Sequence, residues 1–148
     1  MRGADYPVRL NVEIKMQKDR LGIPLEEFAS LVVASIRRHD LVARTTVQSF
    51  RPDALLAVRG LEPELPRAIL ARSRREYVGL MQRSDATILS PRYDGLKRED
   101  VESFRERGIP VIPWTVNEPT DIERMIEWGV DGIISDYPDR VIRIRDRR

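Results

Sequence analysis

The stretch 111–139 carries the sequence pattern of a strand, a helix and a second strand. Residues 109–116 are rich in β-branched side chains and predict a strand, which cannot continue through Pro119. Gly129 is placed to end the following helix, since glycine readily takes the left-handed conformation found just past helix ends. The apolar run 130–135 predicts the second strand. Two parallel strands need a crossover of this kind, so the stretch predicts a βαβ unit.

The helix of this unit has a predicted start and a predicted buried face. We expect Thr120 to cap its first turn and Glu123, three residues later, to reach back to the cap as in a capping box. Ile122, Met125 and Ile126 recur with helical spacing and predict the side that packs on the sheet. Both flanking strands end in polar residues, and in parallel α/β proteins ligands gather at the carboxyl ends of strands.

Near the N-terminus, residues 10–15 alternate between apolar and polar side chains. In a strand, this alternation directs Glu13 and Lys15 to one face and the apolar residues to the other. In a barrel, the polar set would point inward, near the end where active sites lie. The pattern also fits an edge strand with a solvated polar face, and the alternation alone leaves both interpretations open.

Further strands are predicted at regular intervals along the chain. With the units above, the strand ends fall near residues 15, 49, 71, 90, 116 and 135, a spacing typical of repeated βα units. The sequence therefore predicts an α/β fold with six parallel strands and outer helices. Ser49, at a strand end, is a candidate pocket residue. Without a neighbouring base, a serine there is also well explained as a hydrogen-bonding spacer.

Length and composition limit the class of protein. The 148 residues suffice for one domain, yet a (β/α)8 barrel usually takes roughly 250. No stretch is apolar enough to span a membrane, and the N-terminus lacks the apolar run of a secretory signal, so we expect a cytoplasmic protein. Cysteine is absent, which excludes disulfides and thiol chemistry.

The charge of the chain gives only a weak indication of its binding partners. The formal net charge is only +2, and basic residues are interspersed with acidic ones, so the composition does not predict nucleic-acid binding and mildly favours small anions. The basic cluster 72–75 is interpreted as the solvated start of a helix. His39, the single histidine, is expected at a helix C-terminus, where a cation complements the helix dipole.

Four segments together resemble the glycerophosphodiester phosphodiesterases. These segments are LNVEIK at 10–15, VQSF at 47–50, PWTVN at 113–117 and GVDGIISDYP at 129–138. The resemblance implies a (β/α)8 barrel that hydrolyses small glycerophosphodiesters to glycerol 3-phosphate and an alcohol, with Ca²⁺ or Mg²⁺ held by three acidic residues and two histidines acting as acid and base. It further implies that Glu13 is one metal ligand, that Lys15 meets the phosphate, and that Trp114 walls the glycerol side.

The sequence departs from the family pattern at its start. Motifs like HRG and ELDV, which in the family carry a histidine and the other two acids, are not found in the 148 residues. The pair His39-Asp40 imitates the family's HD motif, but it lies at a predicted helix end and is not equated with it. The resemblance is therefore to strands three to eight, and residues 1–148 are interpreted as a single partial domain.

Three interpretations follow: a partial phosphodiesterase with little activity alone, a non-catalytic phosphate-binding or assembly module, and an unrelated parallel α/β domain. For either of the first two, unpaired sheet edges favour a homo-oligomer.

Overall fold

A parallel β-sheet forms the centre of the molecule in the computed structural model, which describes residues 8–16 and 22–147. Its strands neighbour one another in chain order and all pairs are parallel. Each strand has only four or five residues, and β3 is buried along its whole length. The strands are β1 (Leu10–Glu13), β2 (Thr45–Ser49), β3 (Arg67–Ala71) and β4 (Ile88–Pro91).

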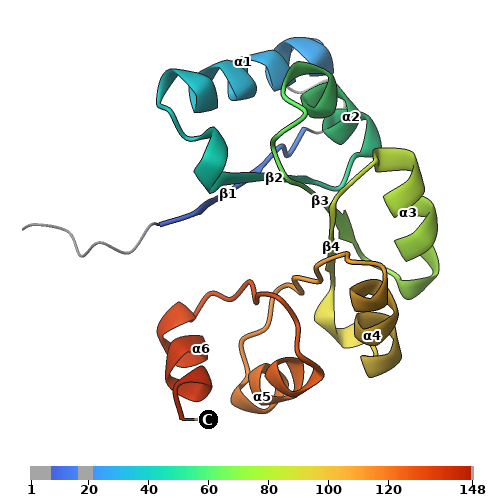
Figure 1. Ribbon diagram of the computed structural model, residues 1–148, viewed down its shortest axis with the longest axis vertical. Helices are drawn as coiled ribbons and strands as arrows, with labels where there is room; N and C mark the ends of the chain where they lie inside the picture. The colour runs from blue at the N-terminus through green and yellow to red at the C-terminus, as the bar shows by residue number, and fades with distance from the viewer. Residues whose placement is uncertain (1–7, 17–21, 148) are drawn as a thin grey trace, which may run out of the picture.

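Helices cover one face of this sheet. In Figure 1 the strands form an arc, the helices follow one another around its outer side, and the arc is open between β1 and α6. The helices are α1 (Leu25–Arg38), α2 (Pro52–Leu61), α3 (Tyr77–Ser84), α4 (Arg98–Glu106), α5 (Pro119–Trp128) and α6 (Pro138–Arg145). Three short 3₁₀ turns precede or follow strands: η1 (Val42–Arg44), η2 (Arg74–Glu76) and η3 (Tyr93–Gly95).

The prediction of six regular strands is wrong for the described residues, which contain four. The expected fifth and sixth strands are extended segments that hydrogen-bond in the correct order without forming a continuous ladder. Residues 111–114 join β4 through two isolated parallel bridges, one from Val111 to Leu89 and one from Trp114 to Arg92. Residues 131–134 bond in turn to 111–116. Pro110 and Pro113 interrupt the first segment, because proline has no N–H to give a ladder.

The start of α5 also differs from the prediction. The residue before the helix is Glu118, Pro119 occupies its first turn, and no side chain caps the free N–H groups, so Thr120 is not the cap. Proline suits the first helical position because its fixed φ matches the helix and its missing N–H has no partner to lose. The predicted end is confirmed, since Gly129 takes φ +71°.

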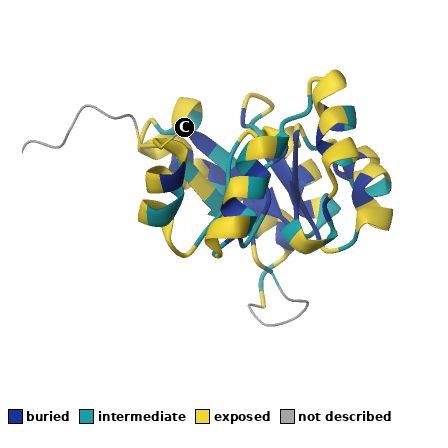
Figure 2. Ribbon diagram, turned by 90° about the horizontal axis from the view of Figure 1, so that it is seen from below, coloured by how far each residue is buried: buried dark blue, intermediate teal, exposed yellow. Residues whose placement is uncertain are grey.

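The core lies between the sheet and the helical layer. Figure 2 shows most of the sheet in the buried class, with exposed residues on the outer sides of the helices. β1 is the exception, since its residues alternate between intermediate and exposed. Ile122 and Met125 of α5 are fully buried and Ile126 packs against the core, which confirms the predicted face of that helix. Within residues 8–16 and 22–147, no helix is both long and apolar enough to cross a membrane.

Candidate functional site

The inner face of the sheet is lined by alternate residues of its strands. A cavity of about 520 Å³ on this side is lined by Asn11, Gln48 and Ser90 among others. The Asn11 amide donates a 2.8 Å hydrogen bond to the side-chain oxygen of Gln48 on the neighbouring strand. The concave side is therefore partly polar at β1 and β2, where an aliphatic core would exclude such groups.

Glu13 and Lys15 follow Asn11 with a period of two. Ile14, between them, is 2% exposed and belongs to the core on the helical side. Because successive side chains of an extended chain point to opposite faces, Glu13 and Lys15 project on the side of Asn11. Both are exposed. Among the described residues, neither has a hydrogen-bond or ion-pair partner, so both remain available to a ligand.

An aromatic pair lies at the carboxyl ends of two other segments. The rings of Phe50, just after β2, and Trp114 meet edge to face with centroids 5.4 Å apart. The Trp114 indole N–H donates to the carbonyl of Ser90 at 2.8 Å, which fixes its orientation. The Arg72 guanidinium stacks 3.8 Å from the centre of the Phe50 ring. These contacts form an apolar aromatic corner with a cation stacked on one of its rings.

The two polar strand ends predicted from the sequence meet directly. The side-chain amide of Asn117 donates to the Asp136 carboxylate at 2.9 Å, and its oxygen accepts from the Ser135 hydroxyl at 3.1 Å. The Arg140 guanidinium donates to the carbonyl of Asn117 at 2.5 Å. This network ties the end of one extended segment to the start of α6.

The Ser49 side chain points to the opposite face of the sheet from its neighbours Gln48 and Phe50. It is fully buried, its hydroxyl donates to the carbonyl of Ile14 at 2.8 Å, and its oxygen accepts from the backbone N–H of Arg51 at 3.1 Å. This geometry favours the hydrogen-bonding spacer over a direct contact with substrate. The serine joins the end of β2 to the chain that carries Glu13 and Lys15.

The described residues do not by themselves fit a divalent cation. A hard cation takes six or more oxygen ligands, several of them carboxylates. No group of three or more Asp, Glu, His or Cys residues is placed to hold an ion within the described part of the chain, and Glu13 supplies a single carboxylate. His39 caps the C-terminal end of α1, as expected.

Sequence reasoning missed Phe50 and Arg72. Phe50 follows Ser49 at a strand end and by alternation points inward, which is the signal that could have identified it. Arg72 lies just after β3, and nothing in the local sequence indicates that its guanidinium reaches Phe50 across the strand ends.

Comparison with known proteins agrees with the arrangement of strands and strand ends. Residues 4–140 match the model of the Glycerophosphoryl diester phosphodiesterase family. A glycerophosphodiester phosphodiesterase of Caldanaerobacter subterraneus subsp. tengcongensis is 32% identical over 147 residues, covering 95% of this chain and 56% of its own. One from Bacillus subtilis is 28% identical over 129 residues, covering 77% of this chain and 43% of its own.

Solved structures share the fold. A putative glycerophosphoryl diester phosphodiesterase from Silicibacter pomeroyi superposes with a TM-score of 0.84 at 30% identity, over 94% of this chain and 50% of that one. A phosphodiesterase from Oleispira antarctica gives a TM-score of 0.82 at 22% identity, over 95% and 56% respectively. The chain thus spans about half the length of these relatives. On the family match and these identities, the chain belongs to the glycerophosphoryl diester phosphodiesterase family.

Proposed function

We propose that this chain forms part of an enzyme that hydrolyses glycerophosphodiesters to glycerol 3-phosphate and an alcohol. The observation that carries the proposal is the pair Glu13 and Lys15, exposed and unpaired among the described residues at the carboxyl end of β1, on the face that Asn11 lines. Family membership supports the reaction class. In this proposal the four strands and the two extended segments, 111–116 and 131–134, correspond to strands three to eight of a (β/α)8 barrel.

Each candidate residue has a defined part in this reaction. Water attacks phosphorus, and the bond from phosphorus to the alcohol oxygen breaks. The Lys15 ammonium neutralises a non-bridging oxygen as a point charge, and Glu13 contributes one carboxylate to a divalent-cation site that needs further ligands. Trp114, held against Phe50, walls the glycerol side, and Ser49 supports the strand end from behind.

We further propose that the 148 residues alone turn over little or no substrate. General acid–base groups typically contribute 10² to 10⁴-fold to a rate. The single histidine lies at the end of α1, and Glu13 is not accompanied by other cation ligands among the described residues. Weak binding of a phosphate ligand through Lys15, without turnover, is the expected residual property.

The test is glycerophosphocholine hydrolysis with Ca²⁺ or Mg²⁺. The 148-residue chain is compared with a version extended at its N-terminus by the first two βα units of a relative. We expect turnover only in the extended protein, with a loss of at least about 100-fold on Glu13→Ala or Lys15→Ala, as removal of a charge-stabilising group produces. Strong turnover by the 148 residues, abolished by Glu13→Ala, would overturn the proposal of low activity. An inactive extended protein would overturn the assignment of function.

A further inference from the structure

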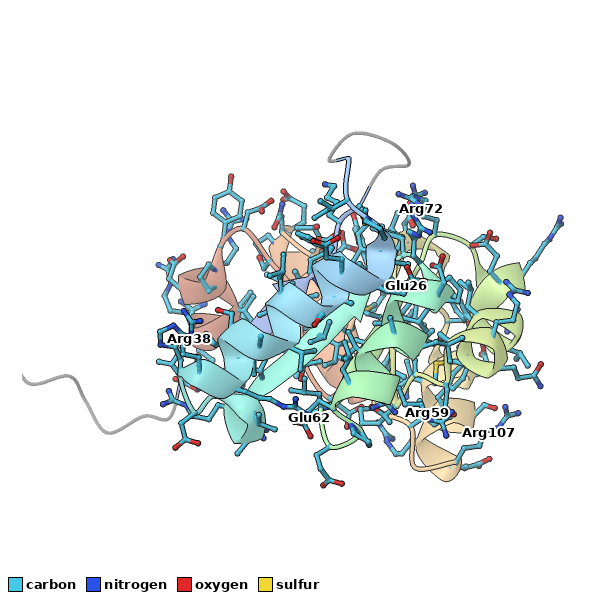
Figure 3. The ribbon with its side chains drawn as sticks, turned by 90° about the horizontal axis from the view of Figure 1, so that it is seen from above. Glu26, Arg38, Arg59, Glu62, Arg72 and Arg107 are labelled. Atoms are coloured by element: carbon cyan, nitrogen blue, oxygen red, sulfur yellow. The ribbon has the colours of Figure 1, made fainter. Side chains whose placement is uncertain are left out.

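A second cavity lies between two neighbouring βα connections, next to the aromatic pair of the candidate site, and Arg72 belongs to both. It measures about 740 Å³ and is bounded by η2 and α3 on one side and by η3 and α4 on the other. Glu13, Lys15 and Trp114 do not line it. Figure 3 labels two of its lining residues, Arg72 and Arg107, toward opposite ends of the same flank of the molecule. The cavity therefore extends along the outside of the sheet, between α3 and α4.

The lining of this cavity is strongly basic. Its two carboxylates already have cationic partners. The Arg74 Nε lies 2.8 and 2.7 Å from the two oxygens of Asp100, and the Arg92 Nε donates to Asp94 at 2.7 Å. The hydrogen bond from Arg92 lowers the pKa of Asp94, so that carboxylate is ionised at neutral pH. The lining cations are Arg72, Arg74, Arg75, Arg92, Lys97 and Arg107.

Four of these cations, Arg72, Arg75, Lys97 and Arg107, have no acidic partner among the described residues. Within residues 8–16 and 22–147, neither Arg75 nor Lys97 forms an ion pair. The Arg107 guanidinium is 5.7 Å from the centre of the Phe104 ring and has no carboxylate partner in the same part of the chain. A cavity lined by like charges is an attractive site for an anion, because the ligand relieves their repulsion.

A buried hydroxyl supplies an independent observation. Tyr77 lines the cavity, is only 2% exposed, and its hydroxyl has no hydrogen-bond partner within the described part of the chain. Buried polar groups are nearly always hydrogen-bonded, so an orphaned one calls for a partner. Burial keeps this hydroxyl protonated over the physiological range, which leaves a donor at the inner wall. An anion would accept that hydrogen bond.

We propose that this cavity binds a phosphate-bearing anion, held by Arg75 and Lys97 and by a hydrogen bond from the Tyr77 hydroxyl. Guanidinium groups match the geometry of phosphate oxygens, and an ammonium adds a point charge. The volume is in the range of sites for small organic ligands. Val78 and Phe104 give the lining an apolar part that suits an organic phosphate. Arg75, Lys97 and Tyr77 are not among the residues proposed for hydrolysis, so this proposal does not depend on the hydrolytic one.

The first test is calorimetric titration of the 148-residue chain with inorganic pyrophosphate at fixed ionic strength. We expect Tyr77→Phe to weaken binding about tenfold, as loss of a hydrogen bond to a charged group does. Arg75→Gln with Lys97→Gln should weaken it further. Arg38→Gln, an exposed cation of α1 that lines neither cavity, is the matched control and should leave the affinity unchanged. Affinity lowered only by Lys15→Gln, at the candidate hydrolytic site, would overturn the proposal, because the anion would then occupy the concave site.

A second measurement separates a ligand role of Tyr77 from a purely structural one. Without anion, Tyr77→Phe should raise the melting temperature, because it removes a buried hydroxyl that lacks a partner. With pyrophosphate, the anion-induced rise in melting temperature should be smaller in Tyr77→Phe than in the wild type. An equal rise in both proteins would show that the hydroxyl does not contact the anion and would overturn its assigned role.

A third measurement identifies the source of the phosphate group. Vesicles of phosphatidylcholine with and without phosphatidic acid are sedimented with the protein. Sedimentation that requires phosphatidic acid and is lost in Arg75→Gln with Lys97→Gln would assign the site to a lipid headgroup. Pyrophosphate binding without sedimentation would assign it to a free phosphate. Binding to neither probe would overturn the proposal.

Discussion

Two buried polar residues, Arg67 and Tyr77, differ in whether hydrogen bonds offset the cost of burying them. Arg67 is 5% exposed, and its guanidinium donates to the carbonyls of Pro63, Leu65 and Asp85. Tyr77 is buried as deeply, yet its hydroxyl has no such partner within the described residues. A buried group without a hydrogen bond costs roughly 1–3 kcal/mol, and nothing among the described residues offsets that cost for the Tyr77 hydroxyl.

Because the Tyr77 hydroxyl is buried, we predict that the protein becomes less stable at alkaline pH. Burial, with a smaller contribution from Asp100, raises the pKa of Tyr77 from 10.0 to about 12. Between these values the unfolded chain has released the proton and the folded chain still holds it, so the free energy of unfolding falls as pH rises. The two-unit shift corresponds to roughly 2–3 kcal/mol. Urea unfolding at pH 9 to 12 should show this loss in the wild type and not in Tyr77→Phe.

An exposed tyrosine provides the control for this measurement. Tyr137 is 47% exposed, so Tyr137→Phe should keep the wild-type pH profile. A Tyr77→Phe protein that loses stability between pH 10 and 12 as steeply as the wild type would contradict the prediction.

At the scale of elements, the ends of α4 and α5 allow a paired prediction. Gly108 and Gly129 follow these helices with φ of +68° and +71°, a conformation that costs other residues roughly 1–3 kcal/mol. A Cβ at Gly108 would meet open space, whereas one at Gly129 would overlap Nη2 of Arg105. That nitrogen donates to the carbonyls of Trp128 and Gly129. Gly129→Ala should therefore destabilise the protein more than Gly108→Ala.

In urea unfolding, Gly129→Ala should lower the free energy of unfolding by about 0.5–1.5 kcal/mol more than Gly108→Ala. This difference is the net contribution of a typical hydrogen bond. In an Arg105→Ala background the two alanine substitutions should become equally costly, because the contact that distinguishes them is gone. Equal losses in the wild-type background would show that Arg105 moves aside without losing its hydrogen bonds.

Elements with strong local signals were predictable, and those decided by competing local rules were not. The sequence predicted β3 and the end of α5 at Gly129, because aliphatic runs and a glycine in the left-handed region act locally. The predicted start of α5 is wrong. Thr120 is a residue type that often caps helices, but Pro119 favours the first helical turn, so the helix starts before Thr120. The predicted fifth strand is not regular, because Pro110 and Pro113 have no backbone N–H to donate to the ladder.

The candidate site and the cavity between α3 and α4 also differ in how far they could be predicted from the sequence. Glu13, Lys15 and Trp114 could be named as candidates because they lie in short segments that resemble a known family. The cavity between α3 and α4 could not, because it joins Tyr77 to Lys97 and other residues distant in sequence. In the sequence, the cluster 72–75 shows only the pattern of a solvated helix start.

At the scale of the whole molecule, β1 lies at one edge of the four-stranded sheet. The Ile14 N–H donates to the carbonyl of Gln48 on β2 at 2.9 Å. Since N–H directions alternate along a parallel strand, the N–H of Val12 points to β2 as well, and those of Asn11 and Glu13 point to the open edge. Exposed edges promote pairing with another chain.

We therefore predict association through this edge. Light scattering should give a mass above that of the 17.2 kDa monomer, increasing with concentration. Hydrogen exchange supplies an internal control: the amides of Val12 and Ile14 should be protected at all concentrations, because β2 covers them. Those of Asn11 and Glu13 should exchange rapidly in dilute protein and become protected as it associates. A larger mass without protection at Asn11 and Glu13 would place the interface elsewhere, and a monomer at high concentration would show that an unpaired β1 edge is tolerated in solution.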